Sequence, residues 1–427
     1  MASKSGTRWV YATLPFNIAT GPVGTFVQLY IIQLSGAGLG TIYASLAVTA
    51  FNAVSIPAAY AWGLVTDKVQ SRRVVILVSF GATTILLVSF LLTGSPIGIV
   101  AVYSAISFIS AAEATPLNLL IMETQPKNMW ARTFARLSMV SSVGTTAGSL
   151  LGAGWTAVFP FAWFVVALGA FSLLSLVLAV LLLHDPPFNF ERQAVVLNRP
   201  SFFNRLLSFP LIFLSRPQAS DFKRIFRGVR NELTSPVPLL YISISTFYLA
   251  SGLFNTSLVP ALSAHSLSSS AVFVVNTVAL IVQTLSFQYV GPYLERRSLS
   301  GVATSGLFLR GACYGLMGVA SFLMPGPLFV LPSLVLFPIA GGVAFAAYYT
   351  ASNTMIFNSL GDRNQGEALG VYSSVVGAFT FLGSLASGFL SYYVGFHVTF
   401  LAAAVILGFS GLATSKLKVE GAGTRNA

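Results

Sequence analysis

Apolar stretches of about 20 residues recur along this chain, and they constrain its fold more than any other feature. A helix needs roughly 20 apolar residues to cross the hydrocarbon core of a membrane, and lipid admits no open structure other than a helix. We count twelve such spans, six before and six after a polar stretch at 184–237. The spans are 10–33, 41–64, 74–93, 97–121, 134–158, 161–183, 238–262, 270–290, 302–323, 328–352, 366–391 and 396–414. The sequence therefore predicts an all-α integral membrane protein with twelve transmembrane helices in two six-helix bundles.

The composition excludes several other classes of protein. Charged residues make up 8% of the chain, whereas soluble domains carry about 25%, so a soluble enzyme, a disordered chain and a coiled coil are excluded. Cys313 is the single cysteine, and neither a Cys/His cluster for a metal nor a catalytic Ser/His/Asp arrangement is visible. The phosphate-binding pattern GxxxxGK[ST] does not occur either. We expect no enzymatic activity, no catalytic or metal-binding residue and no cofactor.

The basic residues predict how the chain is oriented in the membrane. All 23 Lys and Arg residues except Arg310 fall at the termini, in the middle stretch or in the links on one side of the membrane. Cytoplasmic links of membrane proteins are enriched in Lys and Arg. The formal charge of +12 is therefore read as a topology signal and not as affinity for nucleic acid. We expect a multi-pass protein of the cell membrane with both termini cytoplasmic.

The polar stretch divides the chain into an N-terminal bundle (1–184), a cytoplasmic linker (185–237) and a C-terminal bundle (238–427). Within the linker, apolar residues at 202–209 have helical spacing and lie beside Arg199 and Arg205. Such a basic amphipathic segment can lie in the membrane interface. We favour a tether that rests on anionic lipid, and the alternative is a regulatory or partner-docking segment.

The two halves repeat one motif in the link after their second span. Each copy has a glycine, an acid four residues later and a pair of arginines. The residues are Gly63, Asp67, Arg72 and Arg73 in the first half and Gly291, Glu295, Arg296 and Arg297 in the second. Asn118 near the end of the fourth span is likewise matched by Asn353 near the end of the tenth. Internal repeats of this kind are typical of secondary transporters, which bind their substrate between the repeats.

These motifs, the loop 362–370 and the twelve-span pattern resemble the major facilitator superfamily. The resemblance covers essentially the whole chain. It implies two bundles that rock about a central site, and a cytoplasmic latch between helix ends formed by the glycine, acid and arginine motif. The alternative for the motif is a local ion pair that anchors the link on the cytoplasmic side.

Glu113 is the candidate for proton coupling. It alone among the eleven acidic residues lies well inside a span, about 12 Å from the inner end of the fourth span by helix rise. A carboxyl group at that depth must be protonated, paired or in a water-filled cavity, and such residues are functional by default. In the resembled family the fourth span lines the central cavity, so Glu113 would bind a cation or a coupling proton. The alternative is a neutral carboxyl that is hydrogen-bonded within the inner gate.

Polar side chains at helical spacing predict the walls of a substrate cavity. In several spans they recur at intervals that place them on one helix face, and a polar face avoids lipid. The candidates are Asn17, Gln28, Asn118, Tyr241, Tyr248, Asn255, Asn276, Gln283, Tyr348, Tyr349 and Asn353. Hydrogen bonding between helices is the alternative use for such faces. An aromatic and mostly uncharged pocket suits a neutral or amphipathic solute better than a multiply charged anion.

Two further features of the spans carry expectations. Gly144, Gly148 and Gly152 are spaced four apart in the fifth span and predict close helix packing, with a hinge as the alternative. Arg310 is the one basic residue inside a span. For Arg310 we favour snorkelling to the interface or a structural pair, and substrate contact is the alternative.

The sequence thus predicts a secondary active transporter of a small organic solute that works by alternating access, with protons as coupling ion through Glu113. Its expected partners are the solute, protons and membrane lipid, and it is expected to be a monomer that binds no nucleic acid. A facilitative uniporter of a neutral solute is one alternative. A membrane receptor or scaffold that kept the fold without transporting is the other.

Overall fold

The computed structural model describes residues 8–69, 71–126, 129–183, 236–294, 297–324, 326–360 and 365–416. Within these ranges the regular structure is helical and contains no strand. The first half consists of η1 (Arg8–Ala12), α1 (Thr13–Thr20), α2 (Val23–Ser35), α3 (Ala37–Lys68), α4 (Arg72–Ser89), η2 (Phe90–Leu92), α5 (Pro96–Ser110), α6 (Ala114–Thr124), α7 (Trp130–Val158), η4 (Phe161–Trp163) and α8 (Phe164–Leu182). The second half consists of α13 (Pro236–Ala264), α14 (Ser269–Leu294), α15 (Leu299–Leu323), η5 (Gly326–Phe329), α16 (Val330–Pro338), η6 (Ile339–Ala344), α17 (Phe345–Leu360), α18 (Gln365–Tyr393) and α19 (Phe396–Ser415).

Helices occupy all twelve predicted spans, which confirms the all-α fold class. Ten helical segments among the described residues are long and apolar enough to cross a membrane. The other two are the first span, which is split into α1 and α2, and the fifth span, α7, which is rich in Ser, Thr and Gly. The predicted linker, 185–237, lies outside the described residues except for its last two positions.

Proline explains two of the breaks within spans. Pro22 separates α1 from α2, and Pro116 follows the break between α5 and α6. Proline lacks an N–H group, and its ring clashes with the carbonyl four residues earlier. At the second break the exposed carbonyls find side-chain donors, because Trp62 Nε1 donates to Phe108 O at 2.7 Å and Ser79 Oγ donates to Ile109 O at 3.0 Å.

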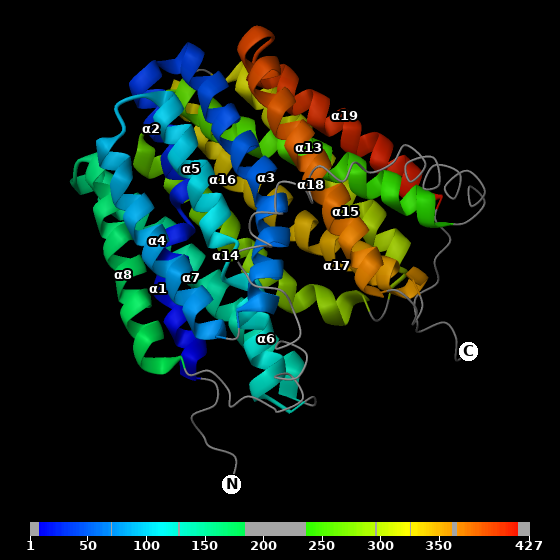
Figure 1. Cartoon of the computed structure of the whole chain (residues 1–427). Coiled ribbons are helices and arrows are strands. Elements are labelled where there is room, and N and C mark those ends of the chain that lie inside the picture. Colours follow the sequence, from blue (N-terminus) through cyan, green and yellow to red (C-terminus); the bar gives the residue numbers. More distant parts are fainter. Residues whose placement is uncertain are drawn as a thin grey trace, which may run out of the picture.

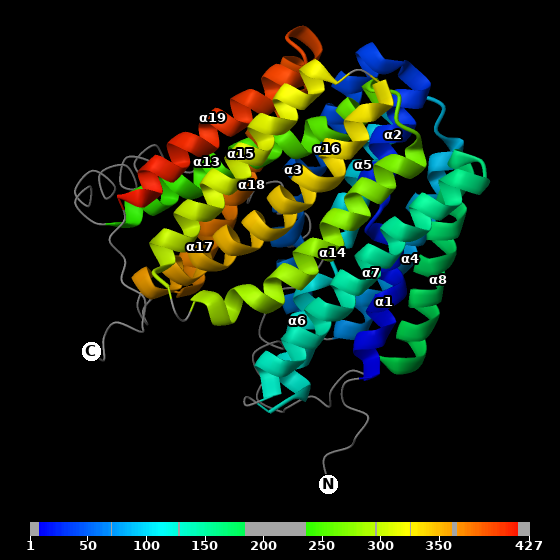
Figure 2. The ribbon, with the colours of Figure 1, turned by 180° about the vertical axis from the view of Figure 1, so that it is seen from behind.

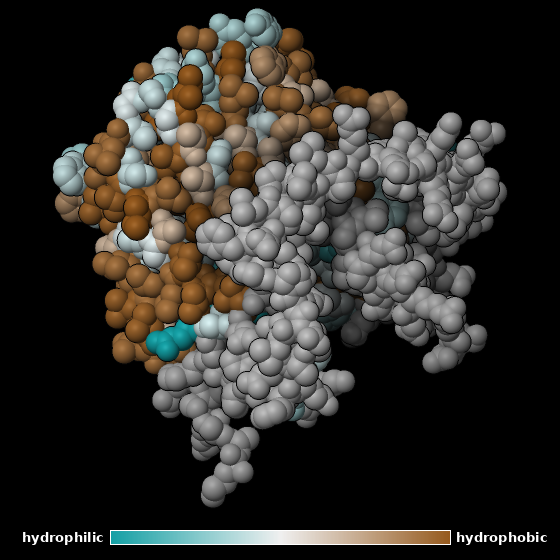
Figure 3. Space-filling model, in the orientation of Figure 1, coloured by the Kyte–Doolittle hydropathy of each residue, from teal (hydrophilic) through white to brown (hydrophobic). Residues whose placement is uncertain are grey.

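The helices form two bundles, α1–α8 and α13–α19, that lie side by side (Figures 1 and 2). The bundles are inclined to one another, and they diverge towards the ends at which η1 begins and α19 ends. We call this the terminal side of the molecule and the opposite one the far side. Hydrophobic side chains cover much of the described surface over α4 and α5 in Figure 3, as expected for helices that face lipid.

Contacts between the bundles are most extensive along two pairs of helices, α3 with α18 and α7 with α14, and α13 adds contacts to α2 and α3. At the first pair, Asn52 donates to Ser384 Oγ at 3.2 Å near the middle of both helices. At the second pair, Ser270 donates to Ala153 O at 2.7 Å, near the far ends of both helices. These contacts hold the bundles together from the middle of the molecule to its far side.

Glycines permit the closest helix contacts, as the sequence predicts for the fifth span. A Cβ atom at Gly144 would lie 2.7 Å from Asn17 Cβ, and one at Gly148 would overlap the carbonyl oxygen of Ile18, so α7 packs directly on α1. In the second half a Cβ atom at Gly383 of α18 would overlap the carbonyl oxygen of Leu249 in α13. The internal repeat therefore extends to the way in which the fifth and eleventh spans pack.

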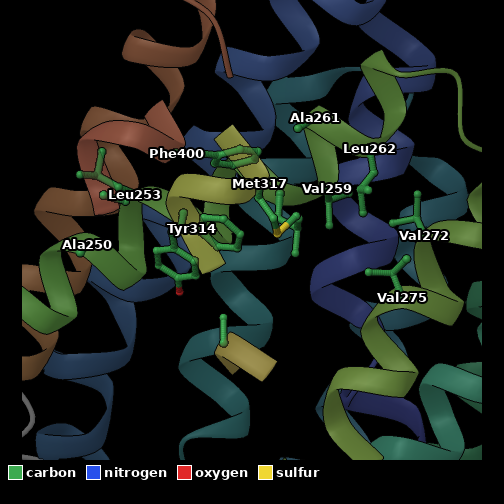
Figure 4. Packing of buried hydrophobic residues seen from close by; sticks show 14 of the residues in the cluster. Ala250, Leu253, Val259, Ala261, Leu262, Val272, Val275, Tyr314, Met317 and Phe400 are labelled. Atoms are coloured by element: carbon green, nitrogen blue, oxygen red, sulfur yellow. The ribbon is translucent and has the colours of Figure 1, made fainter. Parts of the chain in front are cut away.

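The interior of the second half is filled by aromatic and aliphatic side chains from α13, α15 and α19. Phe254 of α13 stacks on Tyr314 of α15 at a ring separation of 3.6 Å and lies 4.7 Å from the ring of Phe400 in α19. Tyr314, Met317 and Phe400 come together in this core (Figure 4). This packing fixes α15 against α13, close to the cavity described below.

Candidate functional site

A cavity of about 350 Å³ lies where the two bundles meet. Both bundles contribute to its wall: α2, the break before it and α7 from the first, and α13 to α17 from the second. The lining residues are Gly21, Gly24, Thr25, Gln28, Thr145, Ser149, Asn255, Leu258, Val259, Asn276, Ala279, Leu280, Gln283, Arg310, Phe337, Gly341 and Phe345. Cavities of this size hold small organic ligands.

Hydrogen bonds across the bundle junction position the polar residues at this cavity. Asn276 Nδ2 of α14 donates to Thr25 Oγ1 of α2 at 3.0 Å. Thr277 Oγ1 donates to Ser149 Oγ of α7 at 2.9 Å. Because each bond joins the two bundles, a solute that engages Asn276 or Ser149 acts on the contact that holds the bundles together.

The tenth span is irregular where it lines the cavity. It changes from α16 to a π-helix, η6, and then to α17, and the residues Phe337, Gly341 and Phe345 at this change line the cavity. π-helical segments occur frequently at functional sites. A Cβ atom at Gly342 would lie 2.9 Å from Gln283 N, so η6 and α14 pack closely at the level of Gln283.

The structure brings together four of the predicted cavity residues, namely Gln28, Asn255, Asn276 and Gln283, and all four line the cavity. They come from three helices of both bundles, and their amide groups can each donate and accept hydrogen bonds. Asn255 is exposed although it lies well inside α13, which is consistent with an accessible cavity.

Five other candidates lie in the second bundle, apart from the cavity lining. Tyr248 and Tyr372 have their hydroxyl oxygens 3.4 Å apart, and Tyr372 is also hydrogen-bonded to Asn353. Tyr348 is buried and hydrogen-bonded to Ser243 at 3.0 Å. Tyr349 is exposed and stacks on Phe345, whereas Tyr241 is half-buried near the start of α13. Tyr372 and Ser243 are the members of this cluster that the sequence analysis missed.

Two candidates in the first bundle do not line the cavity. Asn17 donates to Thr13 O at 2.8 Å within its own helical turn, and it packs against Gly144. Asn17 therefore takes part in the packing of α1 on α7, while its hydrogen bond stays within α1. Asn118 is exposed on α6.

Arg310 of α15 lines the cavity. The sequence favoured snorkelling or a structural pair for this residue, with substrate contact as the alternative. Its side chain is 2% exposed, so it does not reach the membrane surface. The Nε group donates to the hydroxyl of Tyr314 at 2.7 Å, and the guanidinium carbon lies 4.8 Å from the centre of the Phe247 ring and 5.3 Å from that of Phe345. The Nη1 atom is buried without a hydrogen-bond partner among the described residues. In the sequence, the feature that could have indicated this position is Gly306, one helical turn before Arg310. A Cβ atom at Gly306 would lie 3.1 Å from Ala344 O, so the glycine permits close packing of α15 on the tenth span.

Glu113 lies at the break between α5 and α6, about halfway along the fourth span. Its side chain is half-buried, and its Oε2 atom is buried without a hydrogen-bond partner in the part of the chain that the structure describes. Glu113 is not among the residues that line the cavity. Its role in proton coupling stays a prediction.

Arg72 of the repeated motif forms an ion pair with Glu123, a partner from outside the motif. Arg72 Nη2 lies 3.2 Å from Glu123 Oε1 at the end of α6, and both side chains are mostly buried. Arg73 donates to Val180 O of α8 at 2.6 Å. These arginines therefore bind the link after α3 to the terminal-side ends of two other helices. The side chain of Asp67 lies outside the described set, as do Glu295 and Arg296, while Gly63, Gly291 and Arg297 have exposed or half-buried positions.

The model of the family described as Major Facilitator Superfamily matches residues 12–309 and 240–425. The chain belongs to this superfamily. It is accordingly a membrane protein of the secondary-transporter class, and its function is transport rather than enzymatic catalysis. No curated protein matches it.

Solved structures share the fold of this transporter at low sequence identity. A D-xylose-proton symporter superposes with a TM-score of 0.70 at 12% identity, over 98% of this chain and 97% of that one. A POT family transporter in complex with 5-aminolevulinic acid gives 0.69 at 12%, over 94% of each chain. The nucleoside transporter NupG gives 0.64 at 16%, over 95% of this chain and 97% of that one. These likenesses show the fold alone.

Proposed function

We propose that this chain moves a small organic solute across the cell membrane by alternating access, with coupling to protons through Glu113. The observation that carries the proposal is the cavity at the bundle junction, whose amide groups come from both bundles. A site shared between two rigid bodies changes its access when the bodies rock, and this is how repeat-built transporters work.

The position of the cavity supports rocking about the solute. Hydrogen bonds of Asn276 and Ser149 join the bundles at the cavity and towards the far side, while the bundles diverge towards the terminal side. We therefore propose that the structure is one arm of the cycle, in which the bundles meet on the far side and diverge towards the terminal side. We place that side in the cytoplasm because the basic links are there. We propose that the chain works as a monomer, because its own two bundles supply both walls of the cavity.

Glu113 is proposed as the coupling group because its carboxyl is half-buried, has no hydrogen-bond partner at Oε2 among the described residues, and lies at a helix break. A helix break lets a side chain change its surroundings when the segments on either side move. In the outward and inward arms of the cycle the carboxyl would then meet water from opposite sides, and it would carry a proton between them.

The test uses purified full-length protein in proteoliposomes loaded with the pH dye pyranine. A panel of sugars, amino acids, organic acids and nucleosides is added outside, and both lumenal pH and solute uptake are recorded. The proposal predicts that at least one solute enters together with a change in lumenal pH. The Glu113→Gln variant should keep solute exchange and lose the pH change.

The two alternatives give other results in the same assay. A facilitative uniporter shows solute exchange with no pH change in the wild-type protein. A receptor or scaffold shows neither, and deletion of 195–230 would then abolish its action, whereas the same deletion would only alter the rate of a transporter.

A further inference from the structure

We infer that Arg310 binds the anionic group of the transported solute, and that the solute is a small organic monoanion such as a monocarboxylate. The inference rests on the proposed function, and it assigns a substrate class to the same cavity. It starts from the placement of a single guanidinium group inside the membrane-spanning part of the molecule.

A buried cation needs a compensating partner. Moving a charge out of water is strongly unfavourable unless it is paired and hydrogen-bonded. Arg310 is 2% exposed, and no Asp or Glu is among the residues that line the cavity with it. Inside the protein, Nε has one neutral partner, the hydroxyl of Tyr314 at 2.7 Å.

Aromatic rings hold the guanidinium group without neutralising it. The rings of Phe247, Tyr314 and Phe345 have their centres 4.8, 5.2 and 5.3 Å from the guanidinium carbon. Such cation–π contacts offset part of the desolvation cost, and they leave the positive charge intact. Because Nη1 is buried without a partner among the described residues, the side chain keeps a donor and a full charge for a ligand.

The backbone around Arg310 brings this side chain to the cavity. Gly306, one turn before it, has no side chain, and a Cβ atom there would lie 3.1 Å from Ala344 O and 3.2 Å from Tyr348 N. α15 can therefore pack directly on the irregular tenth span, and Arg310 reaches the cavity beside Phe345. α15 thus contributes one residue, Arg310, to the wall of the cavity.

The remaining lining residues define the rest of the solute. Among the described residues that line the cavity, Arg310 is the one with a charge, which favours one negative charge on the solute over two or three. Arginine binds carboxylates with two parallel hydrogen bonds, and the amides of Asn276 and Gln283 can bind further polar groups. Leu258, Leu280 and Phe337 offer an apolar surface. A compact carboxylate with an apolar body meets all of these groups.

The experiment compares isosteric pairs that differ in charge. The melting temperature of the purified full-length protein is titrated at pH 7 with benzoate against benzamide and with hexanoate against hexanamide. A ligand that binds the folded state raises its stability by mass action. We expect each carboxylate to bind at least about tenfold more tightly than its amide, the scale of one charge-assisted hydrogen bond.

Three variants test whether Arg310 is the origin of the preference. Arg310→Met keeps an unbranched apolar side chain among the rings and should abolish the preference for the carboxylate. Arg310→Lys keeps the charge without the planar fork and should retain a smaller preference, which also covers the case in which the Met variant does not fold. Arg132→Met, at an exposed position of α7, removes a cation remote from the cavity and should behave as the wild type does.

Equal binding of carboxylate and amide by the wild type, no binding of any member of the pairs, or an undiminished preference in Arg310→Met would overturn the inference. Sodium chloride at matched ionic strength is a further arm. Stabilisation by chloride through Arg310, with none by the carboxylates, would overturn the organic-acid assignment.

A carboxylate that binds through Arg310 but does not enter proteoliposomes would refute the transport function and leave the site in place. Uptake of neutral solutes alone would support the transport function and refute the assignment of Arg310 as the site for an anionic solute.

Discussion

The close contact between α1 and α7 gives the most quantitative prediction, which concerns Gly144→Ala. A Cβ atom at this position would lie 2.7 Å from Asn17 Cβ and 2.9 Å from Leu14 O. Carbon atoms in favourable contact are about 3.5–4.0 Å apart, so the two helices would have to separate by about 1 Å. The neighbouring Thr145 and Gly21 line the cavity, and the separation would therefore widen it.

The expected cost follows from overpacking. Extra methyl groups in a closely packed interior cost about 1–3 kcal/mol. For a unit of about 200 residues, the size of one bundle, each kcal/mol lowers the melting temperature by about 2–4 °C. Gly144→Ala should therefore lower the melting temperature of the purified protein by several degrees.

Gly154 on the same helix is the matched control. A Cβ atom there would meet no atom within 4 Å, and alanine favours a helix by up to about 1 kcal/mol over glycine. Gly154→Ala should leave the melting temperature unchanged or raise it. If both variants have the same melting temperature, the argument that glycine at 144 permits the contact is refuted.

Three further predictions use other sites. Glu113→Gln should retain solute exchange in pyranine-loaded vesicles and lose the accompanying pH change; a full pH change in the variant would exclude Glu113 as the coupling group. Arg72 and Glu123 form a mostly buried ion pair. A double-mutant cycle with Arg72→Met and Glu123→Gln, measured by the free energy of unfolding, should therefore give a coupling energy of about 1–3 kcal/mol. Additive effects of the two substitutions would mean that the pair contributes nothing to stability. Burial lowers the pKa of His265, which is hydrogen-bonded to Ser321. The contribution of the neutral imidazole to the free energy of unfolding should therefore be full above the unfolded pKa of about 6.5 and decline as the pH falls through and below that value. His265→Gln should show a smaller decline between pH 7 and pH 5, and an identical decline would contradict the assignment.

The fold class could be predicted from the sequence because a backbone that crosses lipid must satisfy its own hydrogen bonds, which leaves few structures besides the helix. Each apolar span of sufficient length must be a helix, and the basic links then order the helices with respect to the membrane. Even the interrupted first span follows from Pro22, and the interrupted fourth span from Pro116.

The candidate site was predicted only in part because helical phase identifies a polar face but not what that face meets. Asn276 and Gln283, which helical phase places on one face of α14, both line the cavity. Asn17, chosen by the same reasoning, is not among the residues that line the cavity, because glycines on α7 bring that helix directly against α1. Which partner a polar face meets depends on the neighbouring helix, and one helix's sequence does not contain this information.

The position of Arg310 likewise depends on neighbouring helices and could not be predicted from its own helix. Its own helix favoured snorkelling to the membrane surface or a structural pair, which are common for a long basic side chain, over substrate contact. Gly306 and the π-helix of the tenth span change this outcome, because they let α15 approach the cavity. Three segments therefore act together to position one side chain.

The central claim, alternating access by rocking of two bundles, is tested most directly by spin-label distances at both ends of α7 and α14. In a Cys313→Ala background, one pair of labels is placed on the terminal side at Arg132 and Tyr289, and another on the far side at Val158 and Ser268, all at exposed positions. We predict two populations in liposomes, one with a long terminal-side and a short far-side distance and one with the opposite combination. A single fixed distance for each pair at every pH and with every solute would contradict it.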